Sequence, residues 1–239
     1  MAPGADGVVP IRPAATVLLL RDGERGLEVL LLRRTTEAVF SPGAHVFPGG
    51  AVDDADRAPD AAAVCGGFTD AAASAALGIE DGGLAYYVAA VRECFEEAGV
   101  LLARGAIDGA RVRFDGPAVV ARFDEHRRRV HAGTLTLADV CGREAIDLSV
   151  DELLPFGHWI TPAGGPRRYD TRFFITTAPP AQEPSHDEHE TTAHGWHRPA
   201  DVLDAHRRGE VDLILPTQRT LELIADGRDV NRVLAEVLA

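Results

Sequence analysis

Two short apolar runs near the start of the chain are separated by a polar turn. The runs cover residues 14–20 and 27–32, and the six residues between them are polar apart from two glycines. Runs of this length that are rich in Val and Leu and flank a glycine-containing turn are typical of a β-hairpin. We therefore predict two antiparallel strands here.

A helical period is strongest between residues 85 and 98, and it ends at Gly99, a common residue for a left-handed helix C-cap. At about 100° per residue, four apolar side chains share one side of this helix. They are Leu84, Val88, Val91 and Phe95. This side is predicted to face the core.

The rest of the chain alternates helical and strand-like segments. Residues 1–13 contain three prolines and two glycines and are predicted to be a flexible N-terminal arm, followed by one domain over residues 14–239. The predicted helices cover residues 70–77, 117–154, 199–208 and 216–225, with a further packed tail at 230–238. The predicted strands are 158–160 and 172–177, and an acidic, His-rich loop covers 179–190.

The composition is that of an acidic globular protein. Of its 239 residues, 46% are apolar and 26% are charged, which argues against general disorder. Acidic residues outnumber basic ones by 37 to 24, giving a net charge of −13. Such a surface repels nucleic acid and anionic membranes, so we expect neither as a partner. A phosphate ligand would need an arginine clamp or a bound divalent cation.

The apolar runs and the cysteines bear on the compartment. The longest apolar run near the start covers residues 17–20, which is too short to cross a bilayer, and no secretory signal is visible in the first sixteen residues. The three cysteines lie far apart and form no C-x-x-C pair. A disulfide framework and a zinc site are therefore not predicted, and the expected location is cytoplasmic.

Three glutamates lie on the side of the helix opposite its apolar side. Glu93, Glu96 and Glu97 form an acidic stripe in which no basic residue is interleaved at the i+4 spacing. Like charges so spaced destabilise a helix by a few tenths of a kcal/mol per pair. A compensating cation is therefore expected, and hard carboxylate oxygens favour Mg²⁺ or Mn²⁺. A solvated acidic helix face is the alternative.

A glycine-rich turn upstream favours the metal interpretation. Residues 43–50 read GAHVFPGG, and glycine pairs let the backbone approach a ligand closely. Together with the segment from Arg92 to Val100, this turn resembles the Nudix box. That pattern has Gly, five residues, Glu, seven residues, and then Arg-Glu-apolar-x-Glu-Glu-x-Gly-apolar. Here Gly50 and Asp56 match the first half, but residues 57–91 provide a spacer of 35 residues.

The box is therefore split, and aspartate replaces its first glutamate. An uninterrupted box would put Leu84 in the acidic position, where leucine has no suitable chemistry. A split box resembles the Nudix subgroup related to the peroxisomal coenzyme A diphosphatase of mammals, and the resemblance covers nearly the whole chain after about residue 14. It implies an α/β fold, the Nudix-type α/β/α sandwich with a mixed sheet, enlarged by helical insertions at about 57–84 and 101–155.

The resemblance also implies the roles of the box residues. Glu96 and Glu97 would bind the metal together with the Gly50 carbonyl. Glu93 would be a further ligand or the base that activates water. Arg92 would hold the carboxylates in place rather than contact the substrate.

Further site residues are expected outside the acidic helix. Many Nudix enzymes draw one more acid from a distant loop, for which Glu190 and then Glu188 are the candidates, although a mobile polar loop is equally consistent with that segment. The predicted substrate-binding residues are Arg33, Arg34, Phe47 and Gly49, although an ordinary strand-end role is equally consistent with the two arginines. Arg167, Arg168 and Arg172 are left open between phosphate binding and strand-end roles. The run 127–129 is expected to be the solvated face of a helix, and Cys94 to be a packing residue.

These features predict an Mg²⁺- or Mn²⁺-dependent hydrolase of a diphosphate bond in a small nucleotide, with coenzyme A or its acyl esters favoured. The alternatives are ADP-ribose, NADH or a nucleotide sugar as substrate, and a non-catalytic nucleotide-sensing module. Because many relatives dimerise, a homodimer is possible.

Overall fold

The computed structural model describes residues 9–37, 41–164, 166–187 and 191–239. Within this part of the chain, seven strands form one mixed sheet, in the order β3-β2-β1-β8-β7, with β4 paired to β1 and β9 to β2. Only the β1–β8 pair is parallel among the pairs described. The strands are β1 (Ile11–Gly23), β2 (Gly26–Arg34), β3 (His45–Val46), β4 (Gly49–Ala51), β7 (Leu154–Ile160), β8 (Arg168–Thr177) and β9 (Thr191–His197).

The predicted hairpin is confirmed, and its first strand is longer than predicted. β1 and β2 pair up to the tight turn at Gly23 and Gly26. At its other end β1 begins at Ile11, so residues 11–13 belong to the sheet rather than to the N-terminal arm. The reason is the parallel pairing with β8, which extends as far as Ile11 opposite Arg168 and is invisible to a local apolar pattern.

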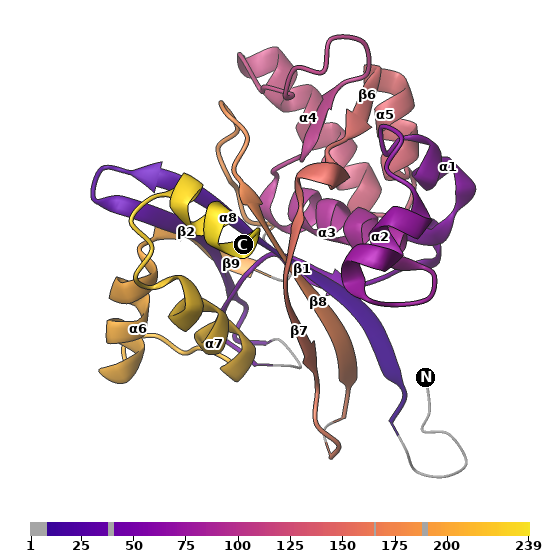
Figure 1. Ribbon diagram of the computed structural model, residues 1–239. Coiled ribbons are helices and arrows are strands. Elements are labelled where there is room, and N and C mark those ends of the chain that lie inside the picture. The colour runs from indigo at the N-terminus through magenta and orange to yellow at the C-terminus, as the bar shows by residue number, and fades with distance from the viewer. Residues whose placement is uncertain (1–8, 38–40, 165, 188–190) are drawn as a thin grey trace.

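Layers of helices cover both faces of the sheet (Figure 1). Val17 and Leu19 pack into a core with α1 (Pro59–Ala63), α2 (Asp70–Leu77), α3 (Gly83–Ala98), α4 (Pro117–His131) and α5 (Leu137–Glu144). Leu18 and Leu20 pack into a second core with α6 (Pro199–Arg207), α7 (Leu215–Ile224) and α8 (Val230–Val237). Burial on both faces explains why β1 is continuously apolar instead of alternating. The α/β/α sandwich is confirmed.

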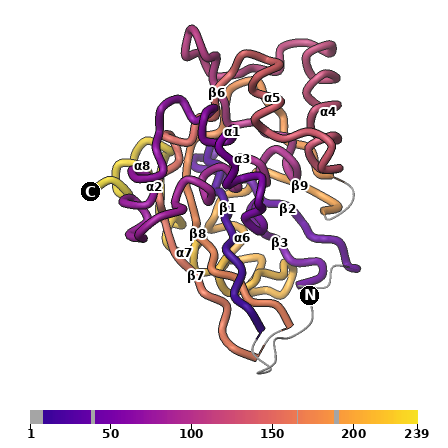
Figure 2. The backbone as a smooth tube through the Cα atoms, turned by 90° about the vertical axis from the view of Figure 1, so that its right-hand side faces the viewer, coloured from indigo at the N-terminus to yellow at the C-terminus, as the bar shows by residue number. Residues whose placement is uncertain are grey.

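The two insertions differ in content. The first contains the predicted helix α2 and the helix α1, which was not predicted. The short 3₁₀ helix η1 (Asp54–Arg57), also not predicted, leads into this insertion. The second is not helical throughout: besides α4 and α5 it holds a two-stranded sheet of β5 (Ala103–Gly105) and β6 (Ile146–Leu148), and the 3₁₀ helix η2 (Val150–Glu152). Both views place α4, α5 and β6 together at one end of the molecule, above α3 (Figures 1 and 2).

Strand β9 was not predicted, because most of its residues are polar or small and several are exposed. Among the helices described, none is long and apolar enough to cross a bilayer. All three cysteines are free and buried.

The sheet opens where β1 changes its antiparallel partner. Residues 20–23 of β1 pair with β2, whereas residues 14–16 pair with β4. β2 separates from β1 beyond this point and continues along β3 and β9. The divergence places the β4 glycines beside α3, which brings the two halves of the split box together.

Candidate active site

Helix α3 is a buried scaffold for the acidic residues. Its predicted apolar side is buried as expected, with Leu84, Val88, Val91 and Phe95 at most 5% exposed. Cys94 is fully buried, and burial raises the pKa of its thiol, so its predicted packing role fits its surroundings. Even Glu97 is only 6% exposed. The acids at the C-terminal end of α3 therefore sit on a fixed backbone.

Arg92 joins the two halves of the split box. Its Nε donates to Asp56 Oδ1 at 2.9 Å and its Nη2 donates to Asp56 Oδ2 at 3.0 Å. Nη2 also donates to the Ala51 carbonyl at 2.8 Å. Nη1 donates to Glu93 Oε1 at 2.9 Å and to Glu96 Oε1 at 3.1 Å. Despite the long spacer, Asp56 therefore contacts the arginine of the box directly.

These contacts correct one feature of the sequence interpretation. The acidic stripe does contain an interleaved base, because Arg92 pairs with Glu96 at the i,i+4 spacing. Helical-wheel angles describe Cβ directions, and a long guanidinium reaches well beyond its own 100° sector. Four carboxylates surround this one cation, since Asp53, Asp56 and Glu93 share it with Glu96. The local excess of negative charge remains, and with it the reason to expect a divalent cation.

The glycines of β4 lie directly against two of the acids. The Gly49 amide donates to Glu97 Oε2 at 2.9 Å. A Cβ at Gly50 would lie 2.4 Å from Glu93 Oε1, so any side chain there would displace that carboxylate. Burial raises the pKa of Glu93 to about 7, although the charge of Arg92 opposes the shift. Glu93 is therefore poised to exchange a proton near neutral pH.

A cavity of about 350 Å³ opens beside these groups. Its volume falls within the range of small-ligand sites, roughly 300–1,000 Å³. One wall consists of alternate residues of β8 and the segment just before it, at positions 167, 169, 171 and 173. The lining residues are Ala14, Thr16, Arg34, Val46, Phe47, Gly49, Gly50, Ala51, Asp53, Glu93, Glu97, Arg167, Tyr169, Thr171, Phe173, Ile214 and Thr217.

Most of the predicted site residues meet at this cavity. Six of them line it: Arg34, Phe47, Gly49, Gly50, Glu93 and Glu97. Arg33, next to Arg34 on β2, is exposed and absent from the lining, because neighbouring strand residues face opposite sides of the sheet.

Two of the predicted metal ligands are not placed at the cavity. Glu96 lies between Arg92 and His131, whose Nδ1 is 3.6 Å from Glu96 Oε2, and it faces a separate cavity of about 200 Å³. Glu190 lies outside the described residues, as does Glu188.

Sequence reasoning missed most of the β8 wall. Tyr169, Thr171 and Phe173 line the cavity, whereas Arg168 donates to the Thr161 carbonyl and Arg172 to the Leu77 carbonyl, outside the lining. Of the three arginines left open, only Arg167 therefore faces the cavity. The signal was the two-residue period of the strand, which separates odd from even positions.

The donor set fits a hard divalent cation. Within the described residues, no group of three or more His, Cys, Asp or Glu side chains is arranged to hold a metal ion. Glu93 and Glu97 line the same cavity as Gly50, whose bare backbone leaves room for one of these carboxylates. Two carboxylates and a backbone carbonyl suit Mg²⁺, which usually retains several waters and takes few protein ligands.

A family model described as the NUDT19 Nudix domain matches residues 68–223, more than half of the chain. The chain belongs to the NUDT19 Nudix domain family. This confirms the resemblance to Nudix hydrolases and to the subgroup with a split box. The buried Asp56–Arg92 pair shows how a member of this family keeps the box together when an aspartate follows the glycine turn and a long insertion precedes α3.

Relatives and solved structures agree with this assignment. The acyl-coenzyme A diphosphatase NUDT19 of Gallus gallus is 33% identical over 252 residues, covering 86% of this chain and 65% of the chicken protein. The human protein of the same name is 29% identical over 224 residues, covering 80% and 58% respectively. The chain thus spans less than two thirds of the length of these relatives. A crystal structure of a NUDIX hydrolase from Alicyclobacillus acidocaldarius has a TM-score of 0.72 at 26% identity and covers 95% of this chain and 96% of its own.

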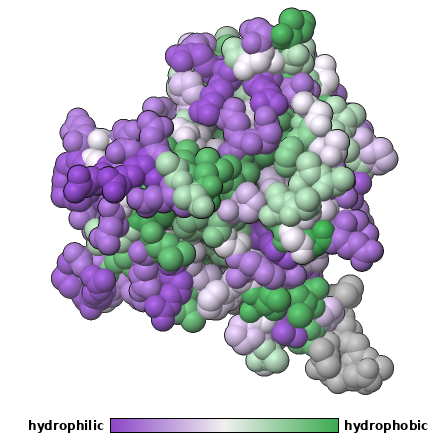
Figure 3. Space-filling view, in the orientation of Figure 1, coloured by the Kyte–Doolittle hydropathy of each residue, from purple (hydrophilic) through white to green (hydrophobic). Residues whose placement is uncertain are grey.

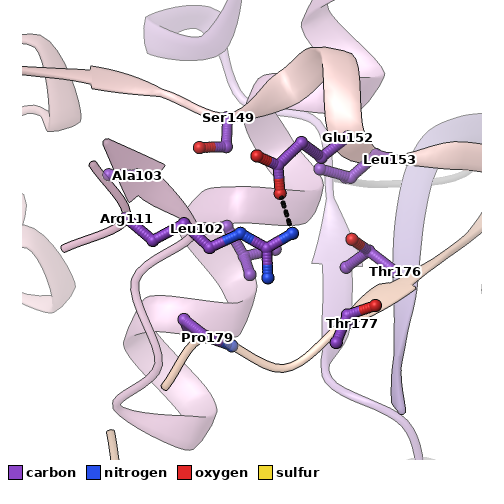
Figure 4. A pocket seen from close by; sticks show the side chains of 9 residues that line it. All are labelled: Leu102, Ala103, Arg111, Ser149, Glu152, Leu153, Thr176, Thr177 and Pro179. Carbon is purple, nitrogen blue, oxygen red and sulfur yellow. Dashed lines mark ion pairs between the residues drawn. The ribbon is translucent and has the colours of Figure 1, made fainter. Parts of the chain in front are cut away.

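Two other hollows lack the chemistry of the Nudix box. A hollow of about 540 Å³ between β7 and the last two helices is lined by residues such as Phe156, Leu223 and Val237. The second hollow is a cavity of about 10 Å³, beside the Arg111–Glu152 ion pair and the Ser149 hydroxyl, with room for about one water (Figure 4). On the surface, apolar residues gather near the middle of the face shown in Figure 3. Neither hollow contains a residue of the box.

Proposed function

We propose that this protein hydrolyses a diphosphate bond in coenzyme A or an acyl-coenzyme A, using Mg²⁺ or Mn²⁺. One observation carries the proposal: the same cavity is lined by two acids of the box, by the β4 glycines and by two arginines. These residues are Glu93, Glu97, Gly49, Gly50, Arg34 and Arg167. The names of the chicken and human relatives favour acyl-coenzyme A over other diphosphates.

The charges of the cavity suit a diphosphate ester. Arg34 and Arg167 approach it from β2 and from the start of β8, and each supplies a planar guanidinium that can bind phosphate oxygens in pairs. In a protein with a net charge of −13, this local pair of cations is what allows an anionic ligand to approach. Tyr169, which is half-buried, adds aromatic surface against which a base can pack, whereas Phe47 and Phe173 are buried and give that part of the lining an apolar floor.

The acids have separate tasks. When bound, a divalent cation neutralises phosphate charge and lowers the pKa of a coordinated water. Glu97, which accepts a hydrogen bond from the Gly49 amide, and Glu93 would hold it with the Gly50 carbonyl. A Glu93 oxygen that does not bind the cation would accept the proton from the attacking water. Arg92 holds Glu93 in place and does not line the cavity.

The test is a product assay with a panel of substrates. The protein is incubated with Mg²⁺ or Mn²⁺ and with coenzyme A, an acyl-coenzyme A, NADH, ADP-ribose or UDP-glucose. Release of 3′,5′-ADP from coenzyme A or its ester is the expected result. Turnover of only another panel member would replace the substrate but keep the chemistry. No turnover of any member, with Mn²⁺ bound, would favour a nucleotide-sensing module. Glu97→Gln should abolish turnover while leaving the circular dichroism spectrum unchanged.

A further inference from the structure

An arginine of the second insertion holds the C-terminal end of the acidic helix. Arg127, on α4, donates from Nε to the Glu96 carbonyl at 2.8 Å and from Nη2 to the Glu97 carbonyl at 3.0 Å. The same guanidinium donates to Ser185, from Nη1 to its hydroxyl at 2.6 Å and from Nη2 to its carbonyl at 2.9 Å. One side chain thus links α4, the end of α3 and the segment before β9.

These bonds complete the hydrogen bonding of the last turn of α3. A helix leaves its last four carbonyls without partners inside the helix. Here the Phe95 carbonyl accepts from the Gly99 amide at 3.0 Å, and the Ala98 carbonyl accepts from the Ser185 amide at 2.9 Å. The two carbonyls between them are those that Arg127 satisfies. No carbonyl of the final turn is left to water alone.

Gly99 is required for this arrangement. It has a φ of +68°, which favours glycine. A Cβ there would also lie 2.7 Å from the Ser185 hydroxyl and 3.0 Å from Arg127 Nη1. The glycine of the box therefore lets the arginine reach the end of the helix as well as terminating it.

Arg127 differs from its neighbour in the basic run, which was predicted to be a solvated helix face. Arg128 fits that prediction: its side chain is 68% exposed and it pairs with Glu125 one turn away. Arg127 is half-buried, and its hydrogen-bond partners are distant in sequence. Glu96 and Glu97 lie 31 and 30 residues before it, and Ser185 lies 58 residues after it. Its contacts are those of an anchor and not of a surface charge.

We propose that Arg127 is a positioning residue for the metal site, because it keeps closed the helical turn from which Glu97 reaches the cavity. Without the guanidinium, two carbonyls of the last turn lose their partners, and this turn would fray. Glu97 would move with it, whereas Glu93 lies one turn earlier and keeps its bond to Arg92. This inference rests on the metal site of the proposed function, but not on the choice of substrate.

The first experiment measures Mn²⁺ binding without substrate. Free Mn²⁺ is titrated by electron paramagnetic resonance against the wild type, Arg127→Met and the matched control Arg128→Met. Loss of a residue that orients metal ligands typically costs about 10- to 100-fold in affinity. We expect a loss of this size for Arg127→Met and less than about 2-fold for Arg128→Met. Ser185→Ala, which removes one bond and leaves the helix carbonyls bonded, should weaken binding only slightly.

A double-mutant cycle separates positioning from loss of fold. If Arg127 acts through Glu97, then Arg127→Met should weaken Mn²⁺ binding much less in a Glu97→Gln background. An equal loss in both backgrounds would overturn the inference, as would unchanged binding by the single variant. If Arg127→Met does not fold, Arg127→Lys takes its place, because it keeps the charge but lacks the planar fork of nitrogens that reaches Glu96, Glu97 and Ser185 together. Absence of Mn²⁺ binding by the wild type would instead refute the proposed function.

Discussion

The buried pair of Asp56 and Arg92 gives the most direct test of the split box. We expect Asp56→Asn to destabilise the protein by about 3 kcal/mol and to lower kcat. Asp56 receives two hydrogen bonds from the guanidinium, at 2.9 and 3.0 Å, and one from the Asp53 amide at 2.8 Å. The Asp56 and Arg92 side chains are 2% and 9% exposed, so water does not replace these bonds.

The magnitude follows from what asparagine can and cannot do. It keeps one acceptor but turns an NH₂ group toward the donors of Arg92, which removes one charge-assisted bond. Removing one partner of a buried ion pair typically costs about 3–5 kcal/mol. Part of this loss is offset, because Glu93 and Glu96 lose a negative neighbour. The lower end of the range is therefore expected, equivalent to a fall in Tm of about 6–12 °C for a domain of this size.

Urea unfolding of matched variants checks this estimate. Asp53→Asn is the control, because Asp53 lies 3.7 Å from Arg92 and its side chain is 58% exposed. Such an exposed pair contributes at most about 1 kcal/mol. If both variants lost the same free energy of unfolding, Asp56 would not be the partner of Arg92 that completes the box. If Asp56→Asn lost the expected free energy of unfolding but kept the wild-type kcat, Arg92 would not be the residue that positions the acids.

Four further outcomes are expected. Gly50→Ala should lower kcat at least about 100-fold with a small change in Tm, because its Cβ would lie 2.4 Å from Glu93 Oε1. Arg34→Ala should raise KM for the substrate more than Arg33→Ala does, because only Arg34 lines the cavity; equal effects would contradict this. EDTA should abolish turnover, and excess Mg²⁺ or Mn²⁺ should restore it. In metal-free buffer the free energy of unfolding should fall between about pH 4.5 and pH 7, by up to about 3 kcal/mol. The reason is that the folded state holds the Glu93 proton more tightly than the unfolded state, and Glu93→Gln should flatten this part of the profile.

Local patterns predicted the elements whose own sequence contains an apolar run, such as β1 and β2, or a helical period, such as α3. A short helix was predicted around residues 70–77, and the structure has it at Asp70–Leu77, with Thr69 as its N-cap and Gly78 as its C-cap. β9 was missed because it is placed by its pairing with β2 and not by its own polar sequence. The start of β1 was missed for the same reason, since β8 lies more than 150 residues away.

The site was predictable for most residues of the box, with Glu96 as the exception because it faces a separate cavity. Glu93, Glu97, Gly49 and Gly50 meet because the motif encodes a turn and a helix that pack together. Arg127 could not be found in this way. Its role depends on where α4 lies, and a run of three arginines on an amphipathic helix gives no sign of which one faces inward.

The long spacer within the box has a physical explanation. Loop closure costs rise only with the logarithm of length, so a fivefold longer spacer adds about 1.4 kcal/mol to the cost of bringing Asp56 and Arg92 together. Even this figure is an upper bound, because the insertion is not a free loop: Ala61 of α1 and Ala73 and Leu77 of α2 are buried in the core beside α3. Removing one partner of the buried ion pair, typically about 3–5 kcal/mol, costs more than the longer spacer does. An insertion between the acid and the arginine is therefore tolerated as long as both partners remain, and Asp56→Asn tests that condition directly.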